Sequence, residues 1–206
     1  MAKLKIHPDY RPLLAAAGLD TFEALFAAGR RGEIDGHKSR SVSRLELAGK
    51  DGRTVVYLKR MWGAAATASW RDLARGRWPR IPAAREWQNA MRLARAGVPV
   101  SPPVAWGCDH GPDGPRALVA VREVRGPSLA KWLSESSNSG AADKIRSSPE
   151  ARRAVAAAVG EAVRRLHEAG FSFPDLYAKH IYIETSDGPA PRIVLIDVPR
   201  LRRFFP

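Results

Sequence analysis

The chain has 206 residues, of which 45% are hydrophobic, so it can bury a substantial core and is not a wholly disordered protein. Lysine and arginine number 34 against 21 acidic residues, and the net charge of +13 favours anionic partners such as nucleic acid, phosphorylated small molecules or an acidic membrane surface. A single cysteine, Cys108, excludes an internal disulfide and a thiolate zinc cluster, and no apolar run approaches the ~18 residues of a membrane span.

The first part of the chain has the pattern of a β-rich region with a few helices. In chain order we expect two short helices within residues 8–29, strands at 41–49 and 53–60, a helix at 82–97, strands at 103–107 and 117–124, and a short helix at 128–135. Asp20, with Glu23 three residues later, predicts the start of the second helix. Asp51 and Gly52 between the first two strands form a hairpin turn signal.

The rest of the chain is predicted to be mainly helical. In chain order it contains a serine-rich linker at 134–150, a long helix that begins after Ser148 and ends at Gly170, and two strands at 181–183 and 192–197 around a turn at 186–191. Strands gathered in the first part and helices in the second predict an α+β fold with two unlike lobes. We place the β-rich N-terminal lobe at residues 1–126 and a short helical C-terminal lobe at residues 127–206.

Three titratable side chains surround the last predicted hairpin. His180 stands just before its first strand and Asp197 just after its second, while Asp175 lies shortly upstream in "FSFPDLYAKHIYI". Because antiparallel pairing brings the two ends of a hairpin together, these side chains should cluster at its open end. Two carboxylates near an imidazole can hold a divalent cation or divide base and metal roles. The spacing alone fits equally well an ordinary turn with solvated acids.

A lysine and a glutamate in the predicted N-terminal lobe form a second candidate pair. Lys59 ends the strand "VVYLK", where a lone lysine commonly extends its ammonium towards solvent. Glu86 lies on a mostly apolar face of the next helix, and an acid in that position usually has a partner. We therefore expect an ion pair between Glu86 and Lys59.

The strand lysine, the helical glutamate and the two aspartates follow one another in the order of the protein kinase fold. The stretches "TVVYLKR", "AAREWQNAMRLARAGVPVSPPVAWG", "LHEAGFSFPDLYAKHIYI" and "IVLIDVPRLRR" resemble, more narrowly, the bacterial lipopolysaccharide kinase family. Members of that family phosphorylate heptose or Kdo sugars of the lipopolysaccharide inner core. The resemblance implies a two-lobed, protein-kinase-like fold and an ATP-dependent transfer of phosphate to a sugar hydroxyl, with Mg²⁺ as the cofactor cation.

The resemblance also implies roles for residues that would contact the nucleotide. Lys59 would hold the α- and β-phosphates, and Glu86 would orient it. The adenine would meet backbone groups near Glu123 and Val124, which follow the strand "ALVAV".

Four further residues would serve phosphate transfer and metal binding. Asp175 would accept the proton of the acceptor hydroxyl, and Lys179 would reach the transferred phosphate unless it is a solvated loop lysine. Asp197 would bind Mg²⁺ together with His180, which stands where protein kinases have a metal-binding asparagine.

The chain departs from the kinase pattern at several points. Phe173-Pro174-Asp175 replaces His-Arg-Asp, and the missing arginine predicts that loop phosphorylation does not control the protein. Asp197 is followed by Val-Pro in place of Phe-Gly. No three-glycine phosphate loop is present, so backbone N–H groups and Arg40 or Arg44 would substitute for its phosphate contacts.

Other functions fit parts of the same sequence. A pseudokinase scaffold would explain the missing glycine loop, although the lysine, glutamate and two aspartates are all present. Small-molecule phosphotransferases such as aminoglycoside kinases share the fold, but we would expect an acidic antibiotic-binding face in them, and this chain is basic. A nucleic-acid-binding protein would be supported by charge alone.

The partners and the setting follow from the leading interpretation. We expect ATP and an anionic sugar or glycolipid acceptor as partners, no specific nucleic acid, and a cytoplasmic protein in peripheral contact with the inner membrane surface. The first residues lack the apolar core of a secretory signal, which agrees with this setting. Because the chain stops at Pro206, soon after Asp197, we expect a fragment or a minimal member with an incomplete acceptor site.

Overall fold

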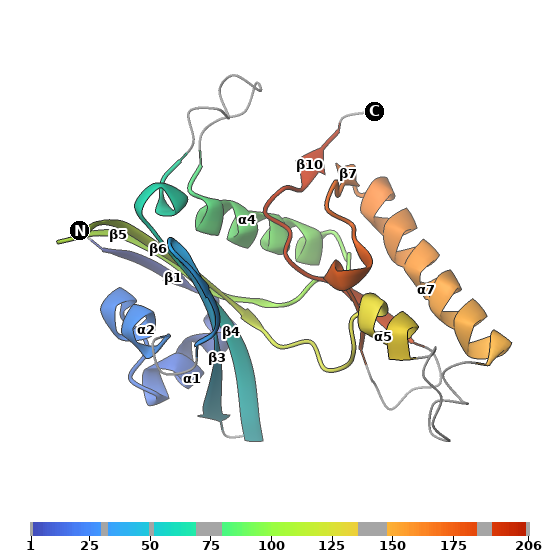
Figure 1. Ribbon diagram of the computed structural model, residues 1–206, viewed down its shortest axis with the longest axis horizontal. Helices are drawn as coiled ribbons and strands as arrows, with labels where there is room; N and C mark the ends of the chain where they lie inside the picture. Colours follow the sequence, from blue (N-terminus) through green and yellow to red (C-terminus); the bar gives the residue numbers. More distant parts are fainter. Residues whose placement is uncertain are drawn as a thin grey trace. The chain divides into compact units, whose positions relative to one another are not determined.

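The structure is a computed structural model that describes residues 2–29, 33–49, 52–68, 80–135, 148–184 and 191–204 (Figure 1). The described residues form two compact units. The first unit comprises Met1–Gln88 and Pro102–Glu123, and the second comprises Asn89–Ser101 and Val124–Pro206. The sequence pattern predicts a single boundary after residue 126, whereas in the structure residues 89–101 also belong to the second unit.

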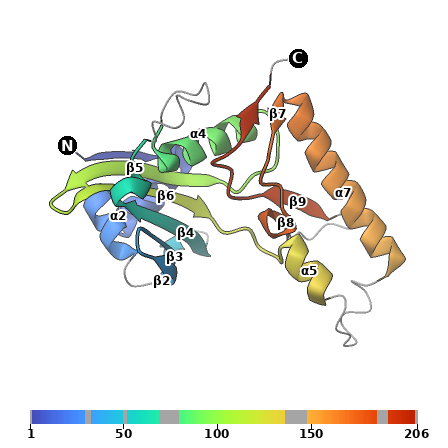
Figure 2. The ribbon, with the colours of Figure 1, turned by 45° about the horizontal axis from the view of Figure 1, so that its top comes forward.

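The first unit is built on a six-stranded sheet with the strand order β1-β5-β6-β4-β3-β2, in which each neighbouring pair is antiparallel (Figure 2). The strands are β1 (Lys3–Ile6), β2 (Glu33–His37), β3 (Arg40–Gly49), β4 (Gly52–Trp62), β5 (Pro103–Gly111) and β6 (Gly114–Arg122). The predicted hairpin between β3 and β4 is confirmed, with Gly49 opposite Gly52. Gly52 has a φ of 108°, a conformation that favours glycine. The other expected turn residue, Asp51, lies outside the described residues.

Two short helices cover one face of this sheet (Figure 1). A 3₁₀ turn, η1 (Pro8–Tyr10), leads into α1 (Arg11–Ala16), and α2 (Phe22–Ala28) follows. Their apolar side chains form one core with the sheet, namely Leu14, Phe22, Leu25 and Phe26 against Val56, Leu58, Val104 and Leu118. The cap of α2 is Thr21, whose side chain accepts a hydrogen bond from the Ala24 N–H, so the predicted start at Asp20 is wrong by one residue.

A buried arginine joins four elements of the first unit. Arg60, in β4, is 4% exposed, and its guanidinium lies 5.5 Å from the centre of the Phe26 ring. The guanidinium donates hydrogen bonds to the Ser41 hydroxyl (3.0 Å), to the Phe26 carbonyl (3.3 Å) and to the Glu33 carboxylate (2.8 Å). A buried charge is tolerated only when it is paired and hydrogen-bonded, and removing the guanidinium would leave its buried acceptors without donors.

We expect Arg60→Met to lower the free energy of unfolding by about 2–4 kcal/mol, because buried acceptors lose their donors. Urea denaturation of both proteins measures the change. The matched control is Arg53→Met on the same strand, because the Arg53 side chain is 72% exposed and its pair with Glu46 is a surface pair. That control should change stability by less than about 0.5 kcal/mol. Equal effects of the two substitutions would contradict the role assigned to Arg60.

The second unit combines helices with two short antiparallel pairs. Its elements are α5 (Leu129–Glu135), α7 (Pro149–Glu168), β7 (Phe171–Ser172), η3 (Ala178–His180), β8 (Ile181–Glu184), β9 (Arg192–Leu195) and β10 (Arg202–Arg203). β8 pairs with β9, and β10 pairs with β7. The expected turn at 186–191 lies, apart from Pro191, outside the described residues, as does most of the expected linker.

The long helix α7 begins as the sequence predicts. The Ser148 side chain accepts a hydrogen bond from the Ala151 N–H, Pro149 occupies the first turn, and Gly170 follows the helix with a φ of 75°. The core of the second unit gathers the buried side chains of α7 and its neighbours, which include Leu93, Val98, Trp132, Val155, Ala162, Leu166, Phe171, Phe173, Ile181, Leu195 and Val198.

A helix belongs in part to each unit. This helix, α4, spans Pro82–Arg95, with Glu86 in the first unit and Leu93 in the core of the second. In the described part of the chain, no helix combines the length and the apolar character needed to cross a membrane.

Candidate functional site

The ion pair that the sequence predicts in the first unit is present. Lys59 lies near the end of β4, Glu86 lies on α4, and the Lys59 Nζ is 2.7 Å from the Glu86 Oε1. The Glu86 side chain is only 7% exposed, and that of Lys59 is 24% exposed. The carboxylate therefore fixes the ammonium at the sheet surface, which is what a lysine needs in order to present its charge to an anion.

A second cluster lies on the same face of the sheet as Lys59. Val42 is opposite Lys59 and Arg44 is opposite Tyr57 in the β3–β4 register, and residues that face each other across such a pair share one face. The Glu123 carboxylate accepts hydrogen bonds from the Tyr57 hydroxyl (3.2 Å) and from the Arg44 Nε (3.5 Å). Burial raises the pKa of Tyr57, and the Glu123 carboxylate raises it further.

These contacts bear on two expectations about the nucleotide. Arg44 forms ion pairs with both Glu46 and Glu123, so it already has acidic partners where the sequence suggested a phosphate contact. The Glu123 N–H donates to the Val55 carbonyl at 2.9 Å and is occupied within the sheet. The adenine contact at Glu123 and Val124 stays a prediction, and the Glu123 N–H is not available for it.

The second unit brings together the three titratable residues around the β8–β9 hairpin. Ile181 is opposite Leu195, and the Ile196 N–H donates to the His180 carbonyl at 3.0 Å. This pairing places the His180 Nε2 3.6 Å from the Asp197 Oδ2. The predicted cluster at the open end of the hairpin is therefore confirmed for His180 and Asp197.

A backbone contact fixes the tautomer of the His180 ring. The His180 Nδ1 lies 2.6 Å from the backbone oxygen of Asp175, and a carbonyl oxygen can only accept a hydrogen bond. Nδ1 therefore carries a hydrogen, and in the neutral ring Nε2 presents its lone pair towards Asp197. A histidine that donates one ring N–H to a backbone carbonyl is oriented as metal-binding histidines are.

Asp197 has an unusual backbone conformation. Its φ is 57°, and among the described residues it is the one non-glycine residue with a positive φ. Such a conformation costs an L-residue about 1–2 kcal/mol, and aspartate and asparagine accept it more readily than most. Strained residues of this kind gather at functional sites, where the surrounding structure holds them in place.

Asp175 has an ion-pair partner that the sequence analysis missed. The Arg200 Nη1 lies 3.1 Å from the Asp175 Oδ1, and the side chains are 63% and 13% exposed respectively. In a chain with 34 lysines and arginines, the only sequence signal for Arg200 is its place in the run "PRLRR". Lys179 is exposed, with its ammonium 5.9 Å from the centre of the Tyr177 ring, and its role at the transferred phosphate stays a prediction.

The donors in the second unit can be compared with the needs of Mg²⁺. Among the residues that the structure describes, no group of three or more His, Cys, Asp or Glu side chains is arranged to hold a metal ion. Mg²⁺ at phosphate-transfer sites, however, is usually bound by one or two carboxylates, and substrate phosphates and water complete its shell. The Asp197 carboxylate, with the His180 Nε2 3.6 Å away, fits that second kind of site.

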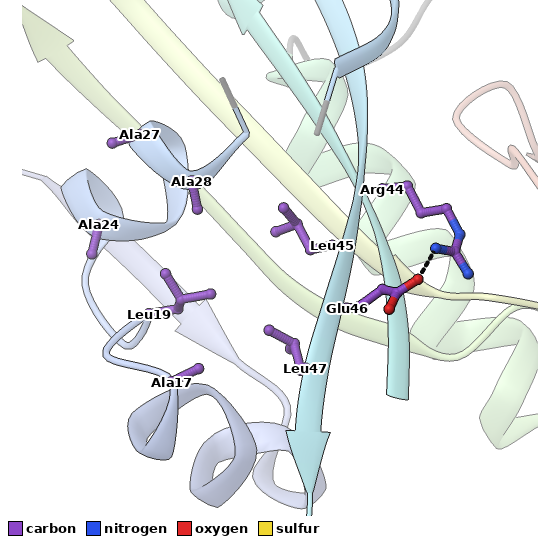
Figure 3. A pocket seen from close by; sticks show the side chains of 9 residues that line it. All are labelled: Ala17, Leu19, Ala24, Ala27, Ala28, Arg44, Leu45, Glu46 and Leu47. Atoms are coloured by element: carbon purple, nitrogen blue, oxygen red, sulfur yellow. Dashed lines mark hydrogen bonds and ion pairs between the residues drawn. The ribbon is translucent and has the colours of Figure 1, made fainter. Parts of the chain in front are cut away.

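A groove of about 540 Å³ in the first unit lies between the α1–α2 pair and β3 (Figure 3). Its lining is largely apolar and consists of Ala17, Leu19, Ala24, Ala27, Ala28, Arg44, Leu45, Glu46 and Leu47. Leu45 and Leu47 point towards the helices, whereas Arg44 and Glu46 point to the other side of the strand (Figure 3). Apart from that ion pair the lining carries no titratable group, so the groove does not supply phosphate-transfer chemistry.

A β-rich unit with a lysine–glutamate pair and a second, helical unit with an aspartate–histidine cluster define a protein of the protein-kinase-like class. The model of the lipopolysaccharide kinase (Kdo/WaaP) family matches residues 15–205. The chain therefore belongs to the lipopolysaccharide kinase family, as the resemblance in its sequence indicates.

The proteins that are similar to the chain include a curated relative and a solved structure. The lipopolysaccharide core heptose(I) kinase WaaP of Pseudomonas aeruginosa is 29% identical over 191 residues, which are 89% of this chain. The match spans 66% of that relative, just under two thirds of its length. A solved structure described as WaaP in complex with acyl carrier protein is 22% identical, with a TM-score of 0.61 over 98% of this chain and 73% of that one. This likeness confirms the predicted α+β, kinase-like fold.

Proposed function

We propose that the protein is an ATP-dependent kinase that phosphorylates a sugar hydroxyl of the lipopolysaccharide inner core or of a similar anionic glycolipid. The observation that carries the proposal is the convergence of the His180 Nε2 and the Asp197 Oδ2, 3.6 Å apart, in a member of a kinase family. A carboxylate oxygen and a ring nitrogen beside it can serve as ligands to a cation, and the nucleotide phosphates would supply further oxygen ligands. The name of the relative, a heptose(I) kinase, supports the acceptor class.

In this proposal each residue acts through its position and charge. Lys59, held by Glu86, contacts the nucleotide phosphates, and Asp197 and His180 hold Mg²⁺. When bound, Mg²⁺ neutralises charge on the phosphate oxygens during transfer. Asp175 accepts the proton of the sugar hydroxyl as that oxygen attacks the terminal phosphate. Little covalent chemistry is required of the protein, because positioning and charge neutralisation dominate phosphate transfer.

The proposal also includes contact between the basic protein and an anionic membrane surface. The net charge of +13 suits ATP and an anionic acceptor, and it also favours peripheral contact with the cytoplasmic face of the inner membrane. Exposed charges of this kind are screened over about 8–10 Å at physiological salt, so such contact would weaken as salt rises.

A catalytically weak pseudokinase is the second candidate. It is favoured by the contact between Arg200 and Asp175, because a carboxylate held by a guanidinium is less available to accept a proton. A pseudokinase would bind nucleotide and transfer no phosphate, whereas a phosphotransferase for other small molecules would transfer it to acceptors that are not lipopolysaccharide.

The test is transfer of labelled phosphate from ATP to lipopolysaccharide core acceptors in the presence of Mg²⁺, together with calorimetry of Mg·ATP binding. Asp197→Asn removes a negative ligand and keeps a side chain that tolerates the positive φ. We expect it to weaken Mg·ATP binding by about 10–100-fold and to lower transfer at least as much.

The control is Asp113→Asn, the same chemical change at an exposed residue between β5 and β6, which should leave both readouts unchanged. Equal Mg·ATP affinity in the wild type and in Asp197→Asn would remove the metal assignment. Nucleotide binding by the wild type without transfer to any acceptor would favour the pseudokinase.

A further inference from the structure

We propose that Arg200 is a recognition residue that binds an anionic group of the acceptor, and that it holds the Asp175 carboxylate when no acceptor is bound. The inference deepens the proposed function and rests on it, because it takes Asp175 as the residue next to which the acceptor hydroxyl binds. The ligand class is a sugar that carries a phosphate or a carboxylate close to the hydroxyl that is phosphorylated.

The first observation is how little of the Arg200 guanidinium is used. Its Nη1 contacts the Asp175 Oδ1 at 3.1 Å, and within the part of the chain that the structure describes this is its one charged partner. A guanidinium has five N–H donors, and the Arg200 side chain is 63% exposed. Most of its donors therefore face solvent beside the carboxylate that is the candidate base.

The second observation is that the backbone around Arg200 is held on both sides. The buried Asn89 side chain donates to the Val198 carbonyl at 2.8 Å, on the N-terminal side of Arg200. On the C-terminal side, β10 pairs with β7, and the Phe204 N–H donates to the Gly170 carbonyl at 3.0 Å. The backbone that carries Arg200 is therefore fixed near Asp175. The guanidinium can move only by rotation of the Arg200 side chain.

The third step is a comparison of interaction strengths. The contact runs through one nitrogen of a largely exposed arginine, so Arg200 can turn away from Asp175 without losing a bidentate pair. A phosphate or carboxylate can take two parallel hydrogen bonds from a guanidinium, and such a pair is the stronger one. When an anionic acceptor binds, Arg200 would therefore leave the Asp175 carboxylate and bind the acceptor's anionic group at a small cost in free energy.

The position of the acceptor makes the exchange productive. A hydroxyl that gives its proton to Asp175 must lie within hydrogen-bond reach of that carboxylate. A charged group on a neighbouring carbon of the sugar then lies within reach of a guanidinium that is itself 3.1 Å from the same carboxylate. Binding the anion frees the base at the moment when the hydroxyl arrives, which links recognition of the correct acceptor to catalysis.

The test compares Arg200→Gln with the wild type on three forms of one lipopolysaccharide core acceptor: native, methyl-esterified at its carboxylates, and dephosphorylated. We expect Arg200→Gln to raise the KM for the native acceptor on the order of tenfold, with a smaller change in kcat and no change in the KM for ATP. For the acceptor form that lacks the recognised anion, the wild type and Arg200→Gln should have the same KM. The form that shows this equality identifies the recognised group as a carboxylate or a phosphate. Arg200→Lys should recover part of the loss, because it keeps the charge.

Arg202→Gln is the matched control, since the same change is made two residues away at an exposed position of β10, and it should behave as the wild type. An unchanged KM for the native acceptor, an equal rise for all three forms, or a change confined to the KM for ATP would overturn the proposal. The last result would assign the guanidinium to the nucleotide phosphates.

A binding measurement separates this inference from the proposed function. If the wild type transfers no phosphate, the proposed function fails, and the affinity of each acceptor form for the wild type and for Arg200→Gln is measured directly by calorimetry. Weaker binding of the native form alone to Arg200→Gln would still support Arg200 as the recognition residue. Equal binding of all forms to both proteins would overturn it.

Discussion

Lys59→Met is expected to abolish measurable Mg·ATP binding and to destabilise the protein by about 2–4 kcal/mol. Binding is lost because the ammonium that contacts the phosphates is removed. Stability falls because the Glu86 side chain, 7% exposed, loses the positive charge 2.7 Å away and remains in a position that water does not reach well. Urea denaturation and calorimetry measure the two effects independently.

A double variant distinguishes the two consequences. Lys59→Met combined with Glu86→Gln removes both charges and should recover most of the lost stability, while nucleotide binding stays absent. Lys5→Met, on the exposed side of β1, is the matched control and should leave stability and binding unchanged. If the single variant binds Mg·ATP like the wild type, Lys59 is not a nucleotide residue. If the double variant also binds, the site lies elsewhere.

Asp175→Asn is expected to lower phosphate transfer about 10²–10⁴-fold and to leave the affinity for Mg·ATP within a few-fold of the wild type. A proton acceptor acts mainly in the transition state, so its removal changes kcat far more than ground-state binding. Asparagine keeps the size of the side chain, and the lost pair with the mostly exposed Arg200 is worth little, so the fold should persist.

The readouts are transfer of labelled phosphate, calorimetry and a thermal unfolding curve, with Asp113→Asn as the control for the chemical change. Normal turnover by Asp175→Asn would show that another group accepts the proton. A large loss of nucleotide affinity would show instead that Asp175 belongs to the cation site, and the division of roles between it and Asp197 would be wrong.

Local patterns predicted those parts of the fold in which a short stretch of sequence decides the structure. The β3–β4 hairpin follows from a glycine turn between two apolar runs, and α7 follows from Ser148 and Pro149 at its start. The Lys59–Glu86 pair was predictable because an acid on an apolar helix face needs a partner, and the strand that precedes that helix carries a lysine near its end.

The features that the sequence did not predict depend on tertiary contacts. β1 has only four residues and forms because β5 offers its edge, with Leu4 opposite Gly107. Residues 89–101 join the second unit because Leu93 and Val98 pack into its core. A prediction with one domain boundary cannot describe two units that are each made of two chain segments. Arg200 is one of many arginines and acquires its importance only from the segment that places it at Asp175.

The hydrogen bond from His180 to the Asp175 carbonyl also makes this ring a spectroscopic reporter. A neutral imidazole held in one tautomer has one protonated and one bare nitrogen, and their ¹⁵N resonances are widely separated. The sequence contains five histidines, few enough for each ring to be identified by substitution. A diamagnetic cation that binds at Nε2 would shift the bare nitrogen far more than the protonated one. Occupancy of the site can thus be followed in solution without an acceptor and without turnover.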